Sequence, residues 1–298
     1  MHLYPIVKIP LDAREDTEQL GSKPKFWVLR DGQRWLFKEA RPNTGEDWAE
    51  KAAAEIAYTL GINAAKVELA EYDGKIGCIS CNFIDVEAGE ALVHGNEIMA
   101  WKVTGYDKSK IFRQADHTLE NIQLAIRALS DFANTDVVLT DLAGYMVLDA
   151  LIGNTDRHHE NWGLRLHSPV AQQTRLLSAA PSFDHASSLG RELLDARRTE
   201  LLANRQVDKY IRSPKARGGI FRDPQQAHGE NPLRLVQVAA RAYPTYFRPA
   251  IERVAAVDTQ VLHDIFERLP PERTADPAKL FAEAMVLSAR TTLLDLLK

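Results

Sequence analysis

A polar cluster follows a strongly apolar segment in the middle of the chain. Residues 151–164 read LIGNTDRHHENWGL, so that Asp156, two adjacent histidines, Glu160 and Asn161 lie side by side. Such a mixture is unsuited to a core, and a solvated surface would not need it. Two kinds of site use these residue types. One is a zinc site built from imidazoles and a carboxylate, and the other is a loop whose carboxylate and amide oxygens orient a nucleophile and hold Mg²⁺.

The spacing within this cluster favours the second kind of site. Asn161 follows Asp156 by five residues, as in the catalytic loop of protein kinases, where the Asp takes the hydroxyl proton and the Asn holds Mg²⁺. Asp184, in SFDHASSLG, stands where the metal-binding Asp of a kinase would lie. We predict Asp156 as the base, Asn161 and Asp184 as Mg²⁺ ligands, and His158 as a residue that braces the loop by hydrogen bonding.

Zinc remains the alternative interpretation of the same cluster. Its ligands would come from His158, His159, Glu160 and His185. Adjacent histidines diverge in most backbones, however, and the sequence contains no H-E-x-x-H helix. These patterns favour Mg²⁺ over zinc.

The chain has two cysteines, Cys78 and Cys81, in GCISCNF. A C-x-x-C pair can be redox-active or can form half of a zinc site. No second pair is present to complete a zinc site, and residues three apart on a strand point to opposite faces. We therefore predict two small buried hydrophobic residues.

A candidate phosphate-binding cation lies in the first third of the chain. Lys38 ends a predicted strand in WLFKEA, where it alternates with apolar neighbours and can point into a cleft. A glutamate on the following helix would hold it toward the phosphates. Glu50 is the expected partner and Glu55 the rival, because the sequence excludes neither. A solvated lysine and surface glutamates are the plain alternative.

A loop before the first hairpin would cover the phosphates. It reads EQLGSKPKFW and has one glycine in place of the G-x-G-x-x-G pattern. Its backbone amides, with the side chain of Lys23 or Lys25, would have to bind the phosphate oxygens. Gly21, Ser22 and Lys23 are therefore predicted to bind the nucleotide.

Two hairpins and a helix are predicted around these residues. Asp-Gly pairs at 31–32 and 73–74 each join two β-prone runs. Between the hairpins, residues 46–60 read as a helix with Thr44 as N-cap and Gly61 as the C-terminal stop.

The character of the sequence changes at about residue 96. Apolar residues then recur at spacings of three and four, which indicates helices. The predicted helices cover residues 118–133, 136–153, 231–243 and 278–297, and two short strand-like runs cover 162–167 and 174–179.

Together these elements predict an α+β, bilobal, protein-kinase-like fold. Residues 1–95 would form a small antiparallel β lobe with one helix, which binds ATP. Residues 96–298 would form a larger, mostly α-helical lobe that carries the catalytic and metal-binding loops.

The bulk composition excludes several classes of protein. The chain of 298 residues has a net charge of −4, which gives no global attraction to nucleic acid or anionic membrane. No apolar run approaches the roughly 20 residues that span a bilayer, and the N-terminal MHLYPIVKIPLD lacks the pattern of a signal peptide. We expect a cytoplasmic protein with no membrane partner. No helix-turn-helix pattern is apparent, so we also expect no direct DNA binding.

One segment departs from the overall acidity. It holds eight basic residues against Glu200 and Asp208, namely Arg197, Arg198, Arg205, Lys209, Arg212, Lys215, Arg217 and Arg222. A solvated loop is one interpretation of such a run. The other is a docking surface for an acidic partner or an RNA-bound protein.

The motifs resemble those of HipA-like serine/threonine kinases from bacterial toxin–antitoxin systems. That family uses an N-x-D-x-H-x-x-N loop followed by a D-H-x-S-S-L-type metal loop, as in LIGNTDRHHENWGL and FDHASSLG here. The helix with Glu50 that ends in Leu-Gly also matches, and CISCNFID, which contains Phe83, resembles the hinge strand that meets adenine. The resemblance covers roughly residues 20–190. About two dozen residues precede the first hairpin, so the chain resembles a short, core-only version.

The resemblance implies ATP and Mg²⁺ as cofactors and a protein hydroxyl as acceptor. It further implies autophosphorylation, with Ser22 as a regulatory site whose added charge would repel ATP phosphates. An aminoacyl-tRNA synthetase, with or without tRNA, would be the substrate, and an antitoxin would be a partner. Two alternatives stay open. DRHHEN also fits the loop of phosphoinositide kinases, which suggests a lipid or small-molecule kinase, and a non-catalytic pseudokinase could act as an antitoxin-binding corepressor.

Overall fold

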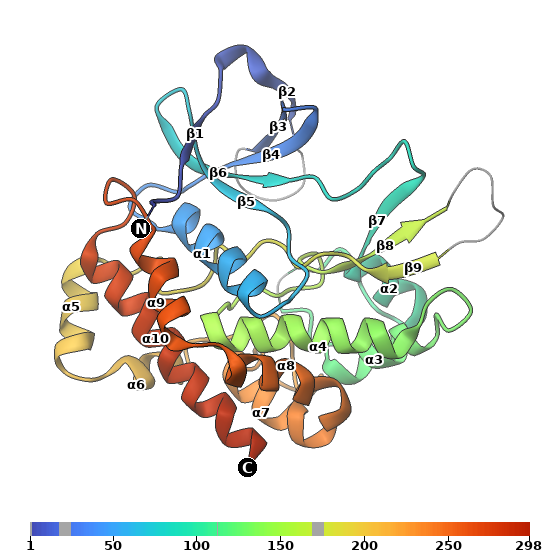
Figure 1. The fold of residues 1–298 in the computed structure, drawn as a ribbon. Helices are drawn as coiled ribbons and strands as arrows, with labels where there is room; N and C mark the ends of the chain where they lie inside the picture. The colour runs from blue at the N-terminus through green and yellow to red at the C-terminus, as the bar shows by residue number, and fades with distance from the viewer. Residues whose placement is uncertain (1, 18–24, 112, 169–175) are drawn as a thin grey trace.

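The computed structural model describes residues 2–17, 25–111, 113–168 and 176–298. A six-stranded sheet forms one end of the molecule, and most of the helices form the other (Figure 1). Helix α1 (Glu46–Thr59) lies between them and packs on the sheet and on α9 (Thr259–Glu267). The arrangement is the predicted one of a β lobe with a single helix and a larger helical lobe.

The six-stranded sheet has the order β1-β5-β6-β4-β3-β2. It is antiparallel except for β1, which pairs in parallel with β5. Both predicted hairpins are present, but the two outer strands at the N-terminus were not predicted, because three or four residues are too few to show alternation. The strands are β1 (Ile6–Lys8), β2 (Arg14–Thr17), β3 (Lys25–Arg30), β4 (Gln33–Glu39), β5 (Val67–Tyr72) and β6 (Lys75–Cys81), with the 3₁₀ turn η1 (Leu11–Ala13) after β1.

The two Asp-Gly pairs form the hairpin turns as predicted. Asp31 and Gly32 have φ of 51° and 75°, and Asp73 and Gly74 have φ of 50° and 72°. Positive φ at both central residues is the condition for the turn whose twist matches that of the flanking strands.

The two faces of the sheet pack differently. Phe26, Trp35, Phe37 and Ile79 form a separate small core on one face. On the other face Cys78 contacts Ala54 of α1. The partly buried Cys81 packs against the first of these cores, so the two cysteines point to opposite faces as predicted, and both are free thiols.

Helix α1 begins at Glu46 and stops at Gly61 as predicted, but its N-cap is a different residue. Gly61 has φ of 62° and donates its N–H to Tyr58 O at 2.9 Å, which is part of a left-handed C-terminal cap. The expected N-cap was wrong: the Thr44 hydroxyl donates to Arg41 O at 2.8 Å, and Gly45 is the N-cap. A Cβ at Gly45 would lie 2.0 Å from the Trp48 indole nitrogen, so a larger residue would displace that ring.

The second sheet lies at the edge of the helical lobe and has the order β7-β8-β9. Strands β8 (Gly163–His167) and β9 (Leu176–Ala179) were predicted, whereas β7 (Glu90–His94) was not. The division into lobes at residue 95 stays a prediction, although β7 precedes it and pairs with β8 beyond it.

The helical lobe is built around α4 (Thr135–Ile152), against which α7, α8 and α10 pack. This helix is apolar on nearly all sides because it is enclosed. The predicted helix at 118–133 is shorter, since it leaves helical geometry at Ala128. Among the described residues, no helix is both long and apolar enough to cross a membrane. The other helices are α2 (Gly95–Lys102), α3 (Leu119–Arg127), α5 (Asp195–Ala203), α6 (Val207–Ile211), α7 (Pro232–Ala242), α8 (Pro244–Ala256) and α10 (Asp276–Leu294), with the 3₁₀ turn η2 (Asp295–Leu297).

Candidate active site

Lys38, Glu50 and Asp184 meet between the first sheet, helix α1 and the helical lobe. The ammonium of Lys38 lies 3.0 Å from Asp184 Oδ1 and 3.9 Å from Glu50 Oε1. The side chains of Lys38 and Glu50 are 11% and 1% exposed, and that of Asp184 is 29% exposed. The three charged side chains therefore form one partly buried cluster, in which Asp184 is the most exposed.

The structure shows which of the two candidate glutamates lies near Lys38. Glu50 faces Lys38, whereas Glu55 accepts a hydrogen bond from Lys51 at 2.7 Å. Lys51 also donates to Glu68 at 2.9 Å, so Glu55 belongs to a different ion-pair network. Burial by itself would lower the pKa of Lys38, but the carboxylates of Asp184 and Glu50 outweigh it and raise the pKa, so the ammonium stays charged.

The loop at residues 154–161 carries Asp156 and Asn161. Hydrogen bonds from its own side chains fix its conformation. Helix α4 ends at Gly153 with φ of 68°, and Asn154 then donates to Asp149 Oδ1 at 2.8 Å. The side-chain oxygen of Asn154 accepts the N–H of Asp156 at 3.1 Å, and Asn161 Nδ2 donates to Asp156 O at 2.7 Å. The positions of Asp156 and Asn161 are therefore set relative to each other.

Arg157 joins this loop to the segment that carries Asp184. Its buried guanidinium binds both carboxylate oxygens of Asp149 at 2.8 Å and donates to Asn161 O at 2.6 Å. It also donates to Ser182 Oγ at 3.0 Å and to Phe183 O at 3.3 Å. The sequence reasoning missed Arg157 and Asp149, although a carboxylate in the last turn of an apolar helix was a usable signal, because it needs a buried partner.

Asp156 has the environment of a proton acceptor. Its side chain is 45% exposed, and burial of the remainder raises the pKa of the carboxyl, as does the charge of Asp184. His158 acts in the opposite direction, with Nε2 at 4.0 Å from Asp156 Oδ1. The Ser187 hydroxyl donates to Asp156 Oδ2 at 3.4 Å. A raised pKa makes the ionised carboxylate a stronger base.

The three histidines near the site lie in separate surroundings. His158 accepts the N–H of Glu160 within the 154–161 loop at 3.2 Å. His159 is hydrogen-bonded to the Tyr106 hydroxyl and His185 to Ser182 Oγ, each at 2.7 Å. Burial lowers the pKa of His159 to about 4 and that of His185 well below its usual value. No group of three or more potential ligands from His, Cys, Asp and Glu occurs among the described residues.

Asp184 and Asn161 offer oxygen ligands that suit Mg²⁺. Asp184 has φ of 60°, an uncommon conformation that Asp tolerates better than most residues. The Asn161 amide nitrogen is bound to Asp156 O, which leaves the amide oxygen to face a cation. Mg²⁺ is commonly held by one or two protein oxygens together with water and substrate phosphates. The donor set therefore fits this ion.

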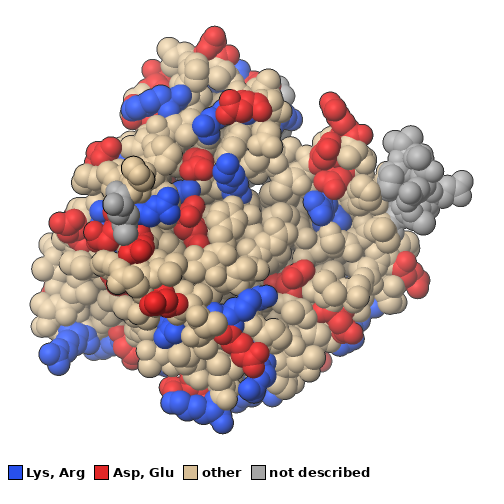
Figure 2. Space-filling view, viewed as in Figure 1, with Lys and Arg blue, Asp and Glu red and all other residues tan. Residues whose placement is uncertain are grey.

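The nucleotide-binding predictions lie only partly within the described residues. Gly21, Ser22 and Lys23 fall outside them. Lys25 begins β3 and lies opposite Lys38 in the sheet register. The surface is indented between the six-stranded sheet and the β7 region (Figure 2). Phe83 lies in the connection from β6 to β7, its ring centroid 5.7 Å from that of Phe183. Contact of Phe83 with adenine stays a prediction.

A further set of contacts, which the sequence did not predict, links α1 to Asp156. Arg191 Nη1 donates to Glu46 Oε1 in the first turn of α1 at 2.8 Å. Its Nη2 donates to Ser187 Oγ at 3.2 Å, and Ser187 in turn contacts Asp156. The backbone N–H of Gly45 donates to Arg191 O at 2.9 Å. The helix that carries Glu50 is thus tied to the carboxylate on the opposite lobe.

Part of the basic segment is neutralised locally. Arg198 is buried and pairs with Asp195 at 2.7 Å. Arg197 pairs with Glu200 at 2.6 Å, and Arg212 with Asp208 at 2.7 Å. On the face in Figure 2, side chains of both charges are interspersed.

The chain resembles known proteins in both sequence and fold. The profile of the HipA-like C-terminal domain family matches residues 19–231. A search of curated proteins found no match. Among solved structures, the Helicobacter pylori proinflammatory kinase CtkA is similar with a TM-score of 0.78 and 18% identity, over 98% of this chain and 96% of that one. HipA of Shewanella oneidensis MR-1, solved with HipB and operator DNA, has a TM-score of 0.57 and 14% identity, over 99% of this chain and 67% of that one.

These likenesses confirm the predicted fold and family. At such identities the two structures show a shared architecture, the bilobal protein-kinase-like fold with its β lobe and helical lobe. The family match extends over more than half of the chain and includes both the 154–161 loop and Asp184. The chain therefore belongs to the HipA-like C-terminal domain family.

Proposed function

We propose that this protein is an ATP- and Mg²⁺-dependent kinase that phosphorylates a Ser or Thr hydroxyl of a protein. The observation that carries the proposal is the convergence of Lys38, Glu50 and Asp184, whose lysine and aspartate are 146 residues apart in the chain. Arg157 ties the loop with Asp156 and Asn161 to the same place. A cation, metal-binding oxygens and a carboxylate base are the parts that phosphoryl transfer needs.

Each residue has one role in this proposal. Bound ATP with Mg²⁺ supplies the phosphoryl group and the charge that neutralises its oxygens. Lys38 would bind phosphate oxygens, and Glu50 would hold its ammonium toward them. Asp184 and Asn161 would hold Mg²⁺ through their side-chain oxygens. Asp156 orients the acceptor hydroxyl and takes its proton.

We further propose partners and a regulatory site that the family membership supports. The related HipA was solved with HipB and operator DNA, and we propose an antitoxin-type protein as partner, with no direct DNA contact by this chain. An aminoacyl-tRNA synthetase, free or bound to tRNA, is the proposed class of substrate. Autophosphorylation is proposed at Ser22, which lies outside the described residues.

The test is transfer of labelled phosphate from ATP with Mg²⁺, first to the protein alone and then to proteins of a bacterial lysate. We expect label on protein with the wild type and its loss with Asp156→Asn. The variant must retain the wild-type melting temperature and ATP affinity, since Asp156 does not bind the nucleotide in this proposal. Phosphopeptide mapping of the labelled chain then locates the acceptor, with Ser22 expected.

Other outcomes select other functions. Label that enters only lipids or small molecules would replace a protein kinase with a phosphoinositide or small-molecule kinase. ATP binding without transfer to any acceptor would indicate a non-catalytic protein that acts through an antitoxin. Absence of ATP binding would contradict the proposal altogether.

A further inference from the structure

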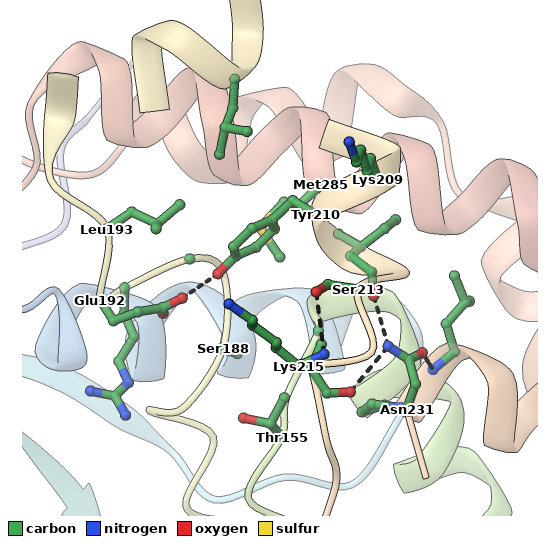
Figure 3. Close-up of a pocket in the computed structure, with 18 of the residues that line it drawn as sticks. Thr155, Ser188, Glu192, Leu193, Lys209, Tyr210, Ser213, Lys215, Asn231 and Met285 are labelled. Carbon is green, nitrogen blue, oxygen red and sulfur yellow. Dashed lines mark hydrogen bonds between the residues drawn. The ribbon is translucent and has the colours of Figure 1, made fainter. Parts of the chain in front are cut away.

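A pocket of about 590 Å³ lies in the helical lobe (Figure 3). Thr155, directly before Asp156, lines it, and so does Ser187, which donates a hydrogen bond to Asp156 Oδ2 at 3.4 Å. Residues of α6 and Met285 of α10 form the opposite wall. A hydroxyl presented to Asp156 would therefore bring the neighbouring part of its own chain to this pocket.

The walls of the pocket are held together by Asn231. Its Nδ2 donates to Ile211 O at 2.8 Å and to Ala216 O at 3.2 Å. Its side-chain oxygen accepts the N–H of Leu233 at 3.0 Å and caps α7. The end of α6, the following loop and the start of α7 are thus joined, and dashed lines at Asn231 in Figure 3 mark such bonds. The pocket is formed before any ligand arrives, which reduces the ordering cost of binding.

The pocket carries an excess of positive charge. Among the residues that the structure describes, Glu192 is the only acidic one that lines it, and its carboxylate accepts a hydrogen bond from the Tyr210 hydroxyl. The basic residues that line it are Arg191, Arg197, Lys209 and Lys215.

Two of the four basic groups have no acidic partner. Arg191 pairs with Glu46 and Arg197 with Glu200. Lys209 and Lys215 form no ion pair with any residue that the structure describes. Figure 3 shows Lys215 extended across the pocket toward Tyr210. Both lysines are exposed residues that line the pocket. An unpaired ammonium in the lining of a polar pocket attracts an anionic group and repels a cationic one.

We propose that this pocket binds an anionic side chain of the acceptor polypeptide, a carboxylate or a phosphoryl group, within about four residues of the phosphorylated hydroxyl. The range follows from the reach of an extended chain, about 3.3 Å per residue. The proposal rests on the proposed function, because it assigns the pocket to the substrate of the same site. Lys215 is the specificity-determining residue, and Lys209 adds to the positive electrostatic potential of the pocket.

The first test uses peptides with one Ser in an Ala-Gly background. Glu, phosphothreonine, Gln or Lys is placed in turn at each of the four positions on either side of the Ser. With the wild type we expect kcat/KM to be about 10-fold higher for Glu or phosphothreonine than for Gln at one or more positions. Whichever anion gives the larger gain identifies the natural group.

Variants at Lys215 test the assignment. In Lys215→Gln we expect kcat/KM for the Glu and Gln peptides to differ by less than about 2-fold. Lys215→Glu should instead give the Lys peptide the higher kcat/KM. The matched control is Arg222→Gln, since Arg222 is an exposed residue of the same basic segment and does not line the pocket. The control should keep the wild-type preference. Equal rates for Glu and Gln peptides, or a preference that survives Lys215→Gln, would overturn the proposal.

A binding measurement separates this inference from the kinase proposal. Fluorescein-labelled Glu and Gln peptides are titrated with protein in low salt without ATP, and Kd is taken from anisotropy. Tighter binding of the Glu peptide that is lost in Lys215→Gln supports the pocket even if no peptide is phosphorylated. Transfer to every peptide without an acidic preference, and with equal Kd values, leaves the kinase proposal standing and removes this one.

Discussion

Glu50 illustrates how a single buried charge can serve a site. Its carboxylate is fully enclosed and stands 3.9 Å from the ammonium of Lys38 and 4.0 Å from His185 Nδ1. Burial lowers the pKa of His185 well below its usual value, so the imidazole is neutral and does not compete with Lys38 for the charge. A buried carboxylate is destabilising unless a cation lies close to it. The pair therefore holds Lys38 in one orientation.

At this scale we predict different effects for two glutamates of α1. Glu50→Gln is expected to lower kcat/KM for ATP by about 10–100-fold, because Lys38 loses its support and is misplaced. Glu55→Gln, which alters the network of Lys51 away from Lys38, is the control and should change kcat/KM by less than about 3-fold. Both variants are measured by steady-state phosphoryl transfer after their melting temperatures have been recorded. Equal losses for the two would contradict the assignment of Glu50.

At the scale of elements, Arg191 connects α1 to the 154–161 loop. Its guanidinium contacts Glu46 and Ser187, and Ser187 contacts Asp156. Its positive charge also acts to lower the pKa of Asp156, against the dominant effect of burial. In the proposed mechanism Arg191 is thus a positioning residue, which supports both the geometry and the ionisation of the carboxylate.

We predict that Arg191→Met reduces kcat by about 10-fold and moves the acidic limb of the kcat/KM–pH profile to higher pH. The sign follows because loss of the positive charge raises the pKa of Asp156, so the base becomes protonated at a higher pH. Arg191→Lys keeps the charge but loses the two-pronged contact, and its profile should keep the wild-type limb with a lower plateau. A purely structural role would lower the plateau of both variants without moving either limb.

At the scale of the whole molecule, one core joins the two lobes. Trp48 and Ile56 of α1 belong to the same cluster of buried residues as α4, α8 and α10. Polar contacts reinforce this junction, since Arg273 pairs with Asp47 of α1 at 2.8 Å and donates to Ala70 O in the sheet at 2.9 Å. The site is therefore set on a continuous core.

Buried histidines make the stability of this core sensitive to acid. His117 accepts the Trp162 indole N–H at 3.0 Å and lies 2.8 Å from Gly219 O through its other nitrogen. Burial lowers the pKa of His117 to about 3 and that of His159 to about 4. Between these values and about 6.5 the unfolded chain binds more protons than the folded one, so stability falls as the pH falls through this window.

We predict that His117 alone lowers the free energy of unfolding by up to about 1.4 kcal/mol for each pH unit below about 6.5. Urea unfolding at pH 7 and pH 5 measures this slope. His117→Asn should be less stable at pH 7 but should have a shallower slope. An unchanged slope in His117→Asn would refute the prediction.

His263 offers the opposite case. Its hydrogen bond to Glu283 raises its pKa, so the protonated imidazole stabilises the folded state at acidic pH. His263→Gln should therefore lower the free energy of unfolding at acidic pH, as measured by the same urea unfolding, and leave it unchanged at high pH.

Short-range patterns determined much of this protein from the sequence alone. The Asp-Gly turns, the stop of α1 at Gly61 and the apolar helix α4 depend on residues within a few positions of each other, and all of them are present in the structure. The Asp156-to-Asn161 spacing and Asp184 indicated the candidate site for the same reason, because the functional residues of a loop lie close together in the sequence. The family and the bilobal fold followed from these motifs and their order.

Only the tertiary structure decided which distant residues meet. It placed Glu50 rather than Glu55 at Lys38, and it revealed Arg157 and Arg191 as the links between segments. It also added β1, β2 and β7, which are strands by virtue of the neighbours they pair with. The pairs of Arg197, Arg198 and Arg212 with acids three or four residues away are local, whereas only the tertiary structure shows Lys215 at a pocket. The contacts of Lys38, Arg157 and Arg191 join segments up to 146 residues apart, which no local pattern encodes.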